Sequence, residues 1–139
     1  MLGFLRKFGA VRDYVRAGDA LSMGQNSLAL ELMEKTQKKL GKSYAKPSLV
    51  DIPIRHAFAA TRSGNFDRAR EALLVAEHSL GMAKKIPPDD MAYLYKFCQT
   101  LAFESDNLDI LKRDESRPFD HSKVSAERKR NFPLVDKSS

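Results

Sequence analysis

The chain has 139 residues, of which 42% are hydrophobic and 30% are charged, so it is long enough for one domain with a buried core. A single cysteine, Cys98, excludes an intrachain disulfide framework and favours a reducing, cytoplasmic location. No stretch approaches the roughly 18 apolar residues that a membrane-spanning helix needs. The formal net charge of +6 arises from Lys and Arg interleaved with acids along the chain, which is typical of a solvated basic surface.

Apolar residues recur every three or four positions in the first stretch and predict a helix that ends near Gly24. The stripe, which we expect to pack against the next helix, comprises Leu2, Leu5, Phe8, Val11 and Val15. A second helix is predicted from a cap at Asn26 or Ser27 to Gly41, because glycine readily adopts the left-handed conformation that ends a helix. The near absence of period-two alternation predicts an all-α protein.

Breaks in the helical spacing divide the rest of the chain into further elements. Asp51 is predicted to cap a third helix, and the sequence SGN at 63–65 separates it from a fourth helix that ends at Gly81. A fifth helix, at about residues 90–104, is the most apolar, and a short sixth helix is expected at 108–111.

The second and fourth predicted helices share a pattern. Aligning them places Gly24 on Gly64 and Gly41 on Gly81, which predicts an internal repeat of 40 residues. The same shift superimposes Ala29 on Ala69, Met33 on Leu73 and Leu40 on Leu80. One helix pair with apolar residues on more than one face cannot bury them alone, so neighbouring pairs must stack.

The segment GNFDRAREALLVA, which begins at Gly64, resembles the second helix of a tetratricopeptide repeat (TPR). The matching positions are Gly64 and Asn65 at the turn, Phe66 as the aromatic, and Ala57, Ala60 and Ala69 as the small residues where helices approach. The resemblance covers residues 8–112, although Asn26 replaces the aromatic in the first unit and Ser105 or Asp106 replaces the turn glycine in the third. It implies a TPR-like short right-handed superhelix of about three antiparallel helix pairs, over residues 1–116.

Residues 117–139 are predicted to form a basic, largely disordered and flexible tail. From residue 112 onward the chain has eight Lys or Arg and five Asp or Glu, with few aliphatic residues. The apolar island NFPLV at 131–135 has two interpretations, a docking segment for another protein or a segment that folds back into this chain's own groove. The sequence ERKR at 127–130 is a candidate contact for nucleic acid or acidic lipid.

No catalytic or metal-binding pattern is apparent in the sequence. His56 stands beside Ala57 and Phe58, as a packing residue does, and three scattered histidines with one cysteine do not make a zinc site. Phosphate-binding loops and nucleophile motifs are also missing. We therefore expect no enzymatic activity, no cofactor and no metal.

The resemblance implies a non-catalytic protein–protein interaction adaptor or scaffold that binds a partner peptide or helix in a concave groove. In repeats of this kind the first helix of each pair lines that groove. The expected partner-binding residues are therefore Arg55, Phe58, Arg62, Tyr93 and Lys96. Their cations favour an acidic partner segment.

Two alternative functions remain open. The N-terminal stretch has Leu and Phe on one face and cations on the other, as helices at a membrane surface do, although we expect that apolar stripe to be used in packing. The cations are Arg6, Lys7, Arg12 and Arg16. Nucleic-acid binding would use the basic tail and groove, and a steep salt dependence would reveal it.

Overall fold

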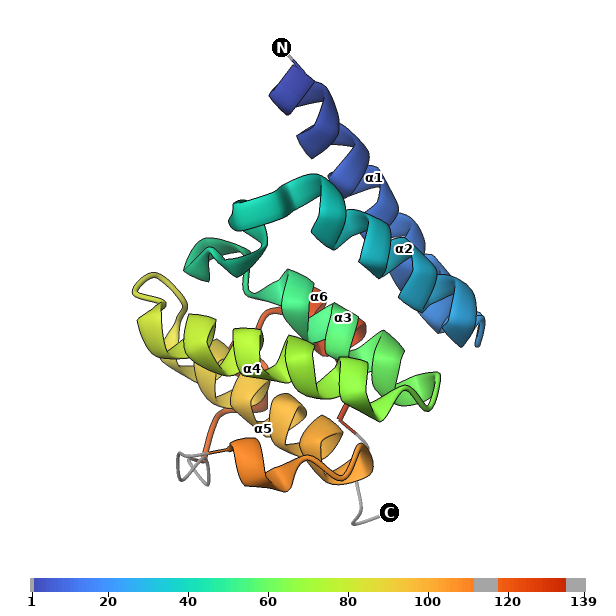
Figure 1. Ribbon diagram of the computed structural model, residues 1–139. Coiled ribbons are helices and arrows are strands. Elements are labelled where there is room, and N and C mark those ends of the chain that lie inside the picture. Colours follow the sequence, from blue (N-terminus) through green and yellow to red (C-terminus); the bar gives the residue numbers. More distant parts are fainter. Residues whose placement is uncertain (1, 112–117, 135–139) are drawn as a thin grey trace.

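A computed structural model describes residues 2–111 and 118–134, with side chains described from residue 7 onward. The described residues form α-helices and short 3-10 turns and no strands, which confirms the all-α prediction (Figure 1). The α-helices are α1 (Leu2–Ser22), α2 (Asn26–Leu40), α3 (Asp51–Arg62), α4 (Phe66–Met82), α5 (Pro88–Glu104) and α6 (Ala126–Asn131). The 3-10 turns are η1 (Gly41–Ala45), η2 (Pro47–Leu49), η3 (Leu108–Ile110) and η4 (His121–Lys123).

The helices stack as antiparallel hairpins, α1 with α2 and α3 with α4, and α5 packs beyond α4 (Figure 1). Helix α3 is central, since every residue from Pro53 to Thr61 is buried. One apolar cluster joins α3, α4 and α5, and a smaller cluster joins α1 and α2 to Ala59 of α3. Among the polar side chains of α3, Arg55, His56 and Thr61 are buried, whereas Arg62 is exposed.

The turns at three places along the chain have the same geometry. In each, a backbone N–H donates at 2.7–2.9 Å to the carbonyl five residues earlier, in the pairs Gln25–Ala20, Asn65–Ala60 and Asn107–Ala102. The residue before the donor has a positive φ, which is 73° at Gly24, 76° at Gly64 and 60° at Asp106. Glycine adopts this conformation without steric cost, and aspartate tolerates it. The two aligned glycines thus mark two copies of one turn, and Asp106 marks a third.

Several predicted helix ends are displaced by one or two residues. The caps predicted at Asn26 or Ser27 and at Asp51 lie inside their helices, whose capping positions have no side-chain hydrogen bond. Gly41 follows the last residue of α2 with a φ of 56°, as predicted. Gly81 instead lies inside α4, which continues to the next residue. The expected sixth helix is the single 3-10 turn η3.

Helix α1 packs through a different face from the predicted one. Its buried residues are small or polar, namely Ala10, Asp13, Ala17 and Ala20. Phe8, Val11 and Val15 are instead 68%, 60% and 52% exposed. The side chains of Leu2 and Leu5 lie outside the described residues. Alanine is small enough to let the α1 backbone approach α2 closely, so the alanine face is the one that packs.

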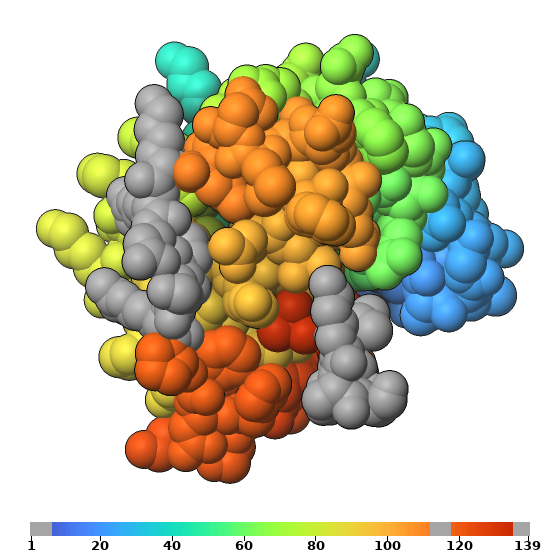
Figure 2. Space-filling model, turned by 90° about the horizontal axis from the view of Figure 1, so that it is seen from below, coloured from blue at the N-terminus to red at the C-terminus, as the bar shows by residue number. Residues whose placement is uncertain are grey.

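The prediction of a largely disordered tail is wrong for residues 118–134. Phe132 and Val124 are buried in the main apolar cluster, and Figure 2 shows this C-terminal segment lying alongside α5. The boundary expected at residue 116 therefore does not separate the segment from the helical core. Residues 131–134 of the NFPLV island fold back onto the chain itself, while residues 112–117 and 135–139 lie outside the described ranges.

Candidate binding site

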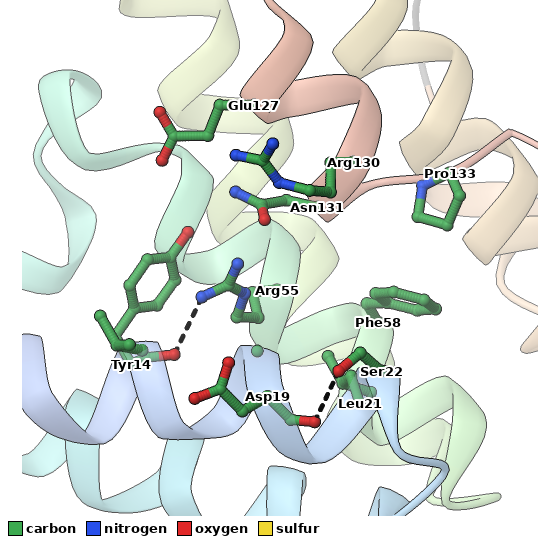
Figure 3. A pocket seen from close by; sticks show the side chains of 12 residues that line it. Tyr14, Asp19, Leu21, Ser22, Arg55, Phe58, Glu127, Arg130, Asn131 and Pro133 are labelled. Atoms are coloured by element: carbon green, nitrogen blue, oxygen red, sulfur yellow. Dashed lines mark hydrogen bonds between the residues drawn. The ribbon is translucent and has the colours of Figure 1, made fainter.

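An open cleft of about 350 Å³ lies between the second half of α1, helix α3 and the C-terminal segment (Figure 3). Its lining includes Tyr14, Gly18 and Asp19 from α1, Arg55 and Phe58 from α3, and Arg130 from α6. The cleft thus joins three parts of the chain that are distant in sequence.

Arg55 lines the cleft although it is only 5% exposed. Its Nη1 donates a 2.9 Å hydrogen bond to the carbonyl of Tyr14, and its Cζ lies 3.9 Å from the centroid of the Tyr14 ring. The buried Nε has no hydrogen-bond partner, and none of the ion pairs among the described residues includes this guanidinium. Figure 3 shows the other terminal nitrogen directed into the cleft. Because a buried cation is costly without a counter-ion, an anionic ligand group would be stabilised here.

Gly18 allows Arg55 to lie against α1. A Cβ atom at Gly18 would stand 2.8 Å from both Cζ and Nη1 of Arg55, closer than such atoms approach. Glycine inside a helix costs roughly 1 kcal/mol relative to alanine. Gly18 therefore leaves room for the guanidinium at the expense of local helix stability.

The remaining polar groups of the cleft carry both signs of charge. Burial raises the pKa of Tyr14 to about 12, and the Arg55 charge opposes this change. The Tyr14 hydroxyl therefore stays protonated near neutral pH and can donate a hydrogen bond. Arg130 faces Arg55 across the cleft, while Asp19 and Glu127 are exposed carboxylates in the lining (Figure 3).

The structure separates the five predicted partner-binding residues. Arg55 and Phe58 line the cleft, whereas Arg62 and Lys96 are exposed and do not belong to its lining. The Cζ of Arg62 lies 5.2 Å from the centroid of the Phe58 ring. Tyr93 is buried beneath the C-terminal segment. The chain itself thus covers part of the surface predicted to receive a partner.

Arg128 fixes the C-terminal segment that forms one wall of the cleft. Its Nη1 donates to Asp90 at 2.6 Å, and its Nε and Nη2 donate to Asp51 at 3.2 and 3.1 Å. Both carboxylates lie in the first turn of a helix, α5 and α3. Lys129 donates to the carbonyl of His121 at 2.8 Å. Two cations of the ERKR sequence therefore serve the fold, which leaves fewer for nucleic acid.

Sequence reasoning missed Tyr14, Gly18 and Arg130 as parts of the site. Gly18 alone carried a usable signal, since a glycine within a helical pattern often marks a close approach. Tyr14 has no such local signal, and the basic ERKR sequence marked Arg130 only as a contact for nucleic acid or acidic lipid, because the place of both residues in the cleft depends on how distant segments pack.

A second polar cluster joins α2, α3 and α4 around His56, which is buried and is not part of the cleft lining. The Tyr44 hydroxyl lies 2.8 Å from its Nδ1, and Glu34 lies 3.4 Å from its Nε2. Burial lowers the pKa of His56, although the Glu34 charge acts in the opposite direction. Burial raises the pKa of Glu34, but hydrogen bonding to Arg68 and the proximity of His56 outweigh it, so the net shift is downward. The geometry fits a packing role for His56.

Comparisons with protein families, with curated proteins and with solved structures give no match. Among residues 2–111 and 118–134, no helix combines the length and hydrophobicity needed to cross a bilayer. Within these ranges, no three His, Cys, Asp or Glu side chains gather where a metal ion would bind.

Proposed function

We propose that this protein is a non-catalytic adaptor or scaffold that holds an acidic segment of a partner protein in the cleft. The observation that carries this function is the Arg55 guanidinium, which is buried in the cleft lining without a carboxylate partner among the described residues. A side-chain or C-terminal carboxylate of the partner would supply the counter-ion. Hydrogen bonds between ionised groups are about twice as strong as neutral ones, so this contact would dominate the affinity.

The helix hairpins support the same function. We propose that they form a short TPR-like superhelix with the cleft on its concave side. Three turns share one geometry, and the α-helical walls of the cleft come from α1 and α3, the first helices of their hairpins, and from α6. In tetratricopeptide repeats, which the sequence resembles, the first helices line the binding groove.

The C-terminal segment indicates the kind of partner segment that this surface accepts. It crosses α3 and α5 as a short helix followed by non-helical residues, and it buries Phe132 with its ring 5.3 Å from that of Phe97. A partner segment with an apolar residue beside an acidic one would match the adjacent cleft, where Phe58 supplies apolar surface. Arg62 and Lys96 remain candidates for contacts with acidic residues farther along that segment.

Selection from a random peptide library displayed on phage tests the proposal. We expect acidic peptides to be enriched on the wild-type protein. A selected peptide should bind the Gly18→Ala variant at least about tenfold more weakly, because the added methyl group displaces the Arg55 guanidinium and a charged hydrogen bond contributes about 1.5–3 kcal/mol. Arg55→Gln should have a similar effect.

The control variant is Lys84→Gln, which removes an exposed cation outside the cleft lining and should leave the affinity unchanged. Enrichment of peptides without acidic groups would contradict the proposal. So would equal affinity of the wild type and Gly18→Ala for the selected peptide.

A further inference from the structure

The outward face of α1 carries an apolar stripe with cations on both sides. Phe8, Val11 and Val15 form the stripe, since steps of three and four residues share a helix face. The exposed cations Lys7, Arg12 and Arg16 flank it. Residues 7–18 contain a single acid, Asp13, which is buried and paired with Lys39 at 2.6 Å. Over residues 7–18 this face therefore presents apolar and positive groups to a partner, and the exposed Asp19, four residues after Val15, marks the end of the stripe.

The loop after α2 extends this positive surface. Lys42 and Lys46 are exposed there, and an apolar recess of about 220 Å³ opens between the loop and α1. The recess is lined by Ala10, Val11, Leu40 and Leu49, with Lys7 and Lys46 also in its lining. Apolar surface beside cations matches the layering of a bilayer, in which acyl chains lie beneath anionic headgroups.

The shape of this region favours a flat partner. Figure 1 shows the first turns of α1 projecting beyond the rest of the molecule. A projecting, convex helix can lie along a flat surface with its apolar stripe inserted, as interfacial helices do. The peptide cleft, in contrast, is hollow and begins at the other half of α1.

We propose that the outward face of α1 docks the protein onto an anionic membrane surface. The stripe inserts among the lipids, and the flanking cations bind the headgroups. Val15 belongs to both the stripe and the cleft lining, but Phe8, Arg12 and Arg16, at which docking is tested, lie outside that lining. The two proposals can therefore fail separately.

Flotation with lipid vesicles tests the docking. The full chain should float with vesicles of phosphatidylcholine and phosphatidylglycerol in equal parts at about 0.05 M salt, and much less at about 0.5 M, where screening is stronger. Vesicles of phosphatidylcholine alone should bind it weakly. Arg12→Glu/Arg16→Glu should reduce partitioning by more than about tenfold, since each cation near the surface contributes about fivefold.

Two matched controls distinguish binding through this face of α1 from attraction by the net charge of the protein. Lys84→Glu/Lys85→Glu makes the same change in net charge on the exposed loop before α5 and should leave partitioning within about twofold, if docking uses α1. Arg12→Lys/Arg16→Lys should keep wild-type binding to the vesicles, because a bilayer attracts either cation. A protein partner that binds the planar arginine guanidinium would instead bind this variant more weakly.

A tryptophan at Phe8 supplies a local readout, because the chain has no natural tryptophan. The emission of Phe8→Trp should shift to the blue with the mixed vesicles, and lipids brominated in their acyl chains should quench it. The control Leu74→Trp, at an exposed position on α4, should show neither the blue shift nor the quenching.

Three outcomes would overturn the proposal. The first is no flotation with anionic vesicles at low salt. The second is flotation that Arg12→Glu/Arg16→Glu leaves intact. The third is a wild-type dimer in light scattering that Phe8→Ser converts to a monomer, because a second copy of the chain would then cover the stripe.

Discussion

The hydroxyl of Tyr93 on α5 donates a 2.6 Å hydrogen bond to the backbone carbonyl of Phe132 in the C-terminal segment. Both residues are almost completely buried. A buried carbonyl needs such a partner because water cannot reach it. The bond therefore ties the last described turn of the chain into the same core as α3 and α5.

Removing the Phe132 ring tests whether this segment is part of the cooperative fold. Phe132→Ala should lower the free energy of unfolding by about 3–5 kcal/mol, because it leaves a cavity beside Phe97. Urea denaturation followed by circular dichroism measures the change. Phe8→Ala, the same substitution at an exposed position, should cost little. Equal effects of the two variants would show that the segment does not stabilise the core.

The buried His56 makes stability depend on pH. Its pKa in the folded protein is below its ordinary value of 6.5, so at slightly acidic pH the unfolded chain binds more protons than the folded one. The free energy of unfolding should therefore fall as the pH drops below about 7. The pKa of Glu34 is also lowered in the folded protein, so the free energy of unfolding should fall further when the pH drops below 4.5, the ordinary pKa of this group.

Urea midpoints over a series of pH values measure this dependence. His56→Gln should flatten it between about pH 7 and 5, even if the variant is less stable overall. His78→Gln, at an exposed position on α4, should retain the wild-type slope. A wild-type slope in His56→Gln would show that His56 is not the group that titrates.

At the turn residues with a positive φ, substitution by glycine and substitution by alanine should change the free energy of unfolding in opposite directions. Asp106→Gly should raise the free energy of unfolding by up to about 1 kcal/mol, because a residue with a Cβ is disfavoured at a φ of 60°. Gly64→Ala should lower it by about 1–2 kcal/mol for the same reason. Gly81→Ala, inside α4, should instead stabilise by up to about 1 kcal/mol. Thermal unfolding measures the three variants. Melting temperatures that all shift in the same direction would contradict this account.

The hairpin turns and most helix positions between residues 26 and 104 were predictable because their signals are local. Glycine at positions that need a positive φ and helical spacing of apolar residues act over only a few residues. Repetition of the same signals after 40 residues made the second hairpin predictable from the first.

The packing face of α1 and the fate of the C-terminal segment depend on distant contacts. Helix α1 has both an alanine face and a larger apolar stripe, and hydrophobicity alone selects the wrong one. The C-terminal segment has a polar average composition, but a few anchors hold it in place. These are Phe132, Val124 and Arg128, each of which depends on residues of α3 or α5. The cleft likewise required Gly18 and Arg55 to meet across 37 sequence positions.

Nuclear magnetic resonance of the arginine side chains tests the central claim most directly. With an acidic peptide selected on the wild-type protein, the Nε–H signal of Arg55 should shift strongly as a carboxylate reaches its guanidinium. The Nε–H signal of Arg68 should stay in place, because that group already donates to Glu34 at 2.6 Å. If the peptide binds while the Arg55 signal does not move, the cleft is not the binding site.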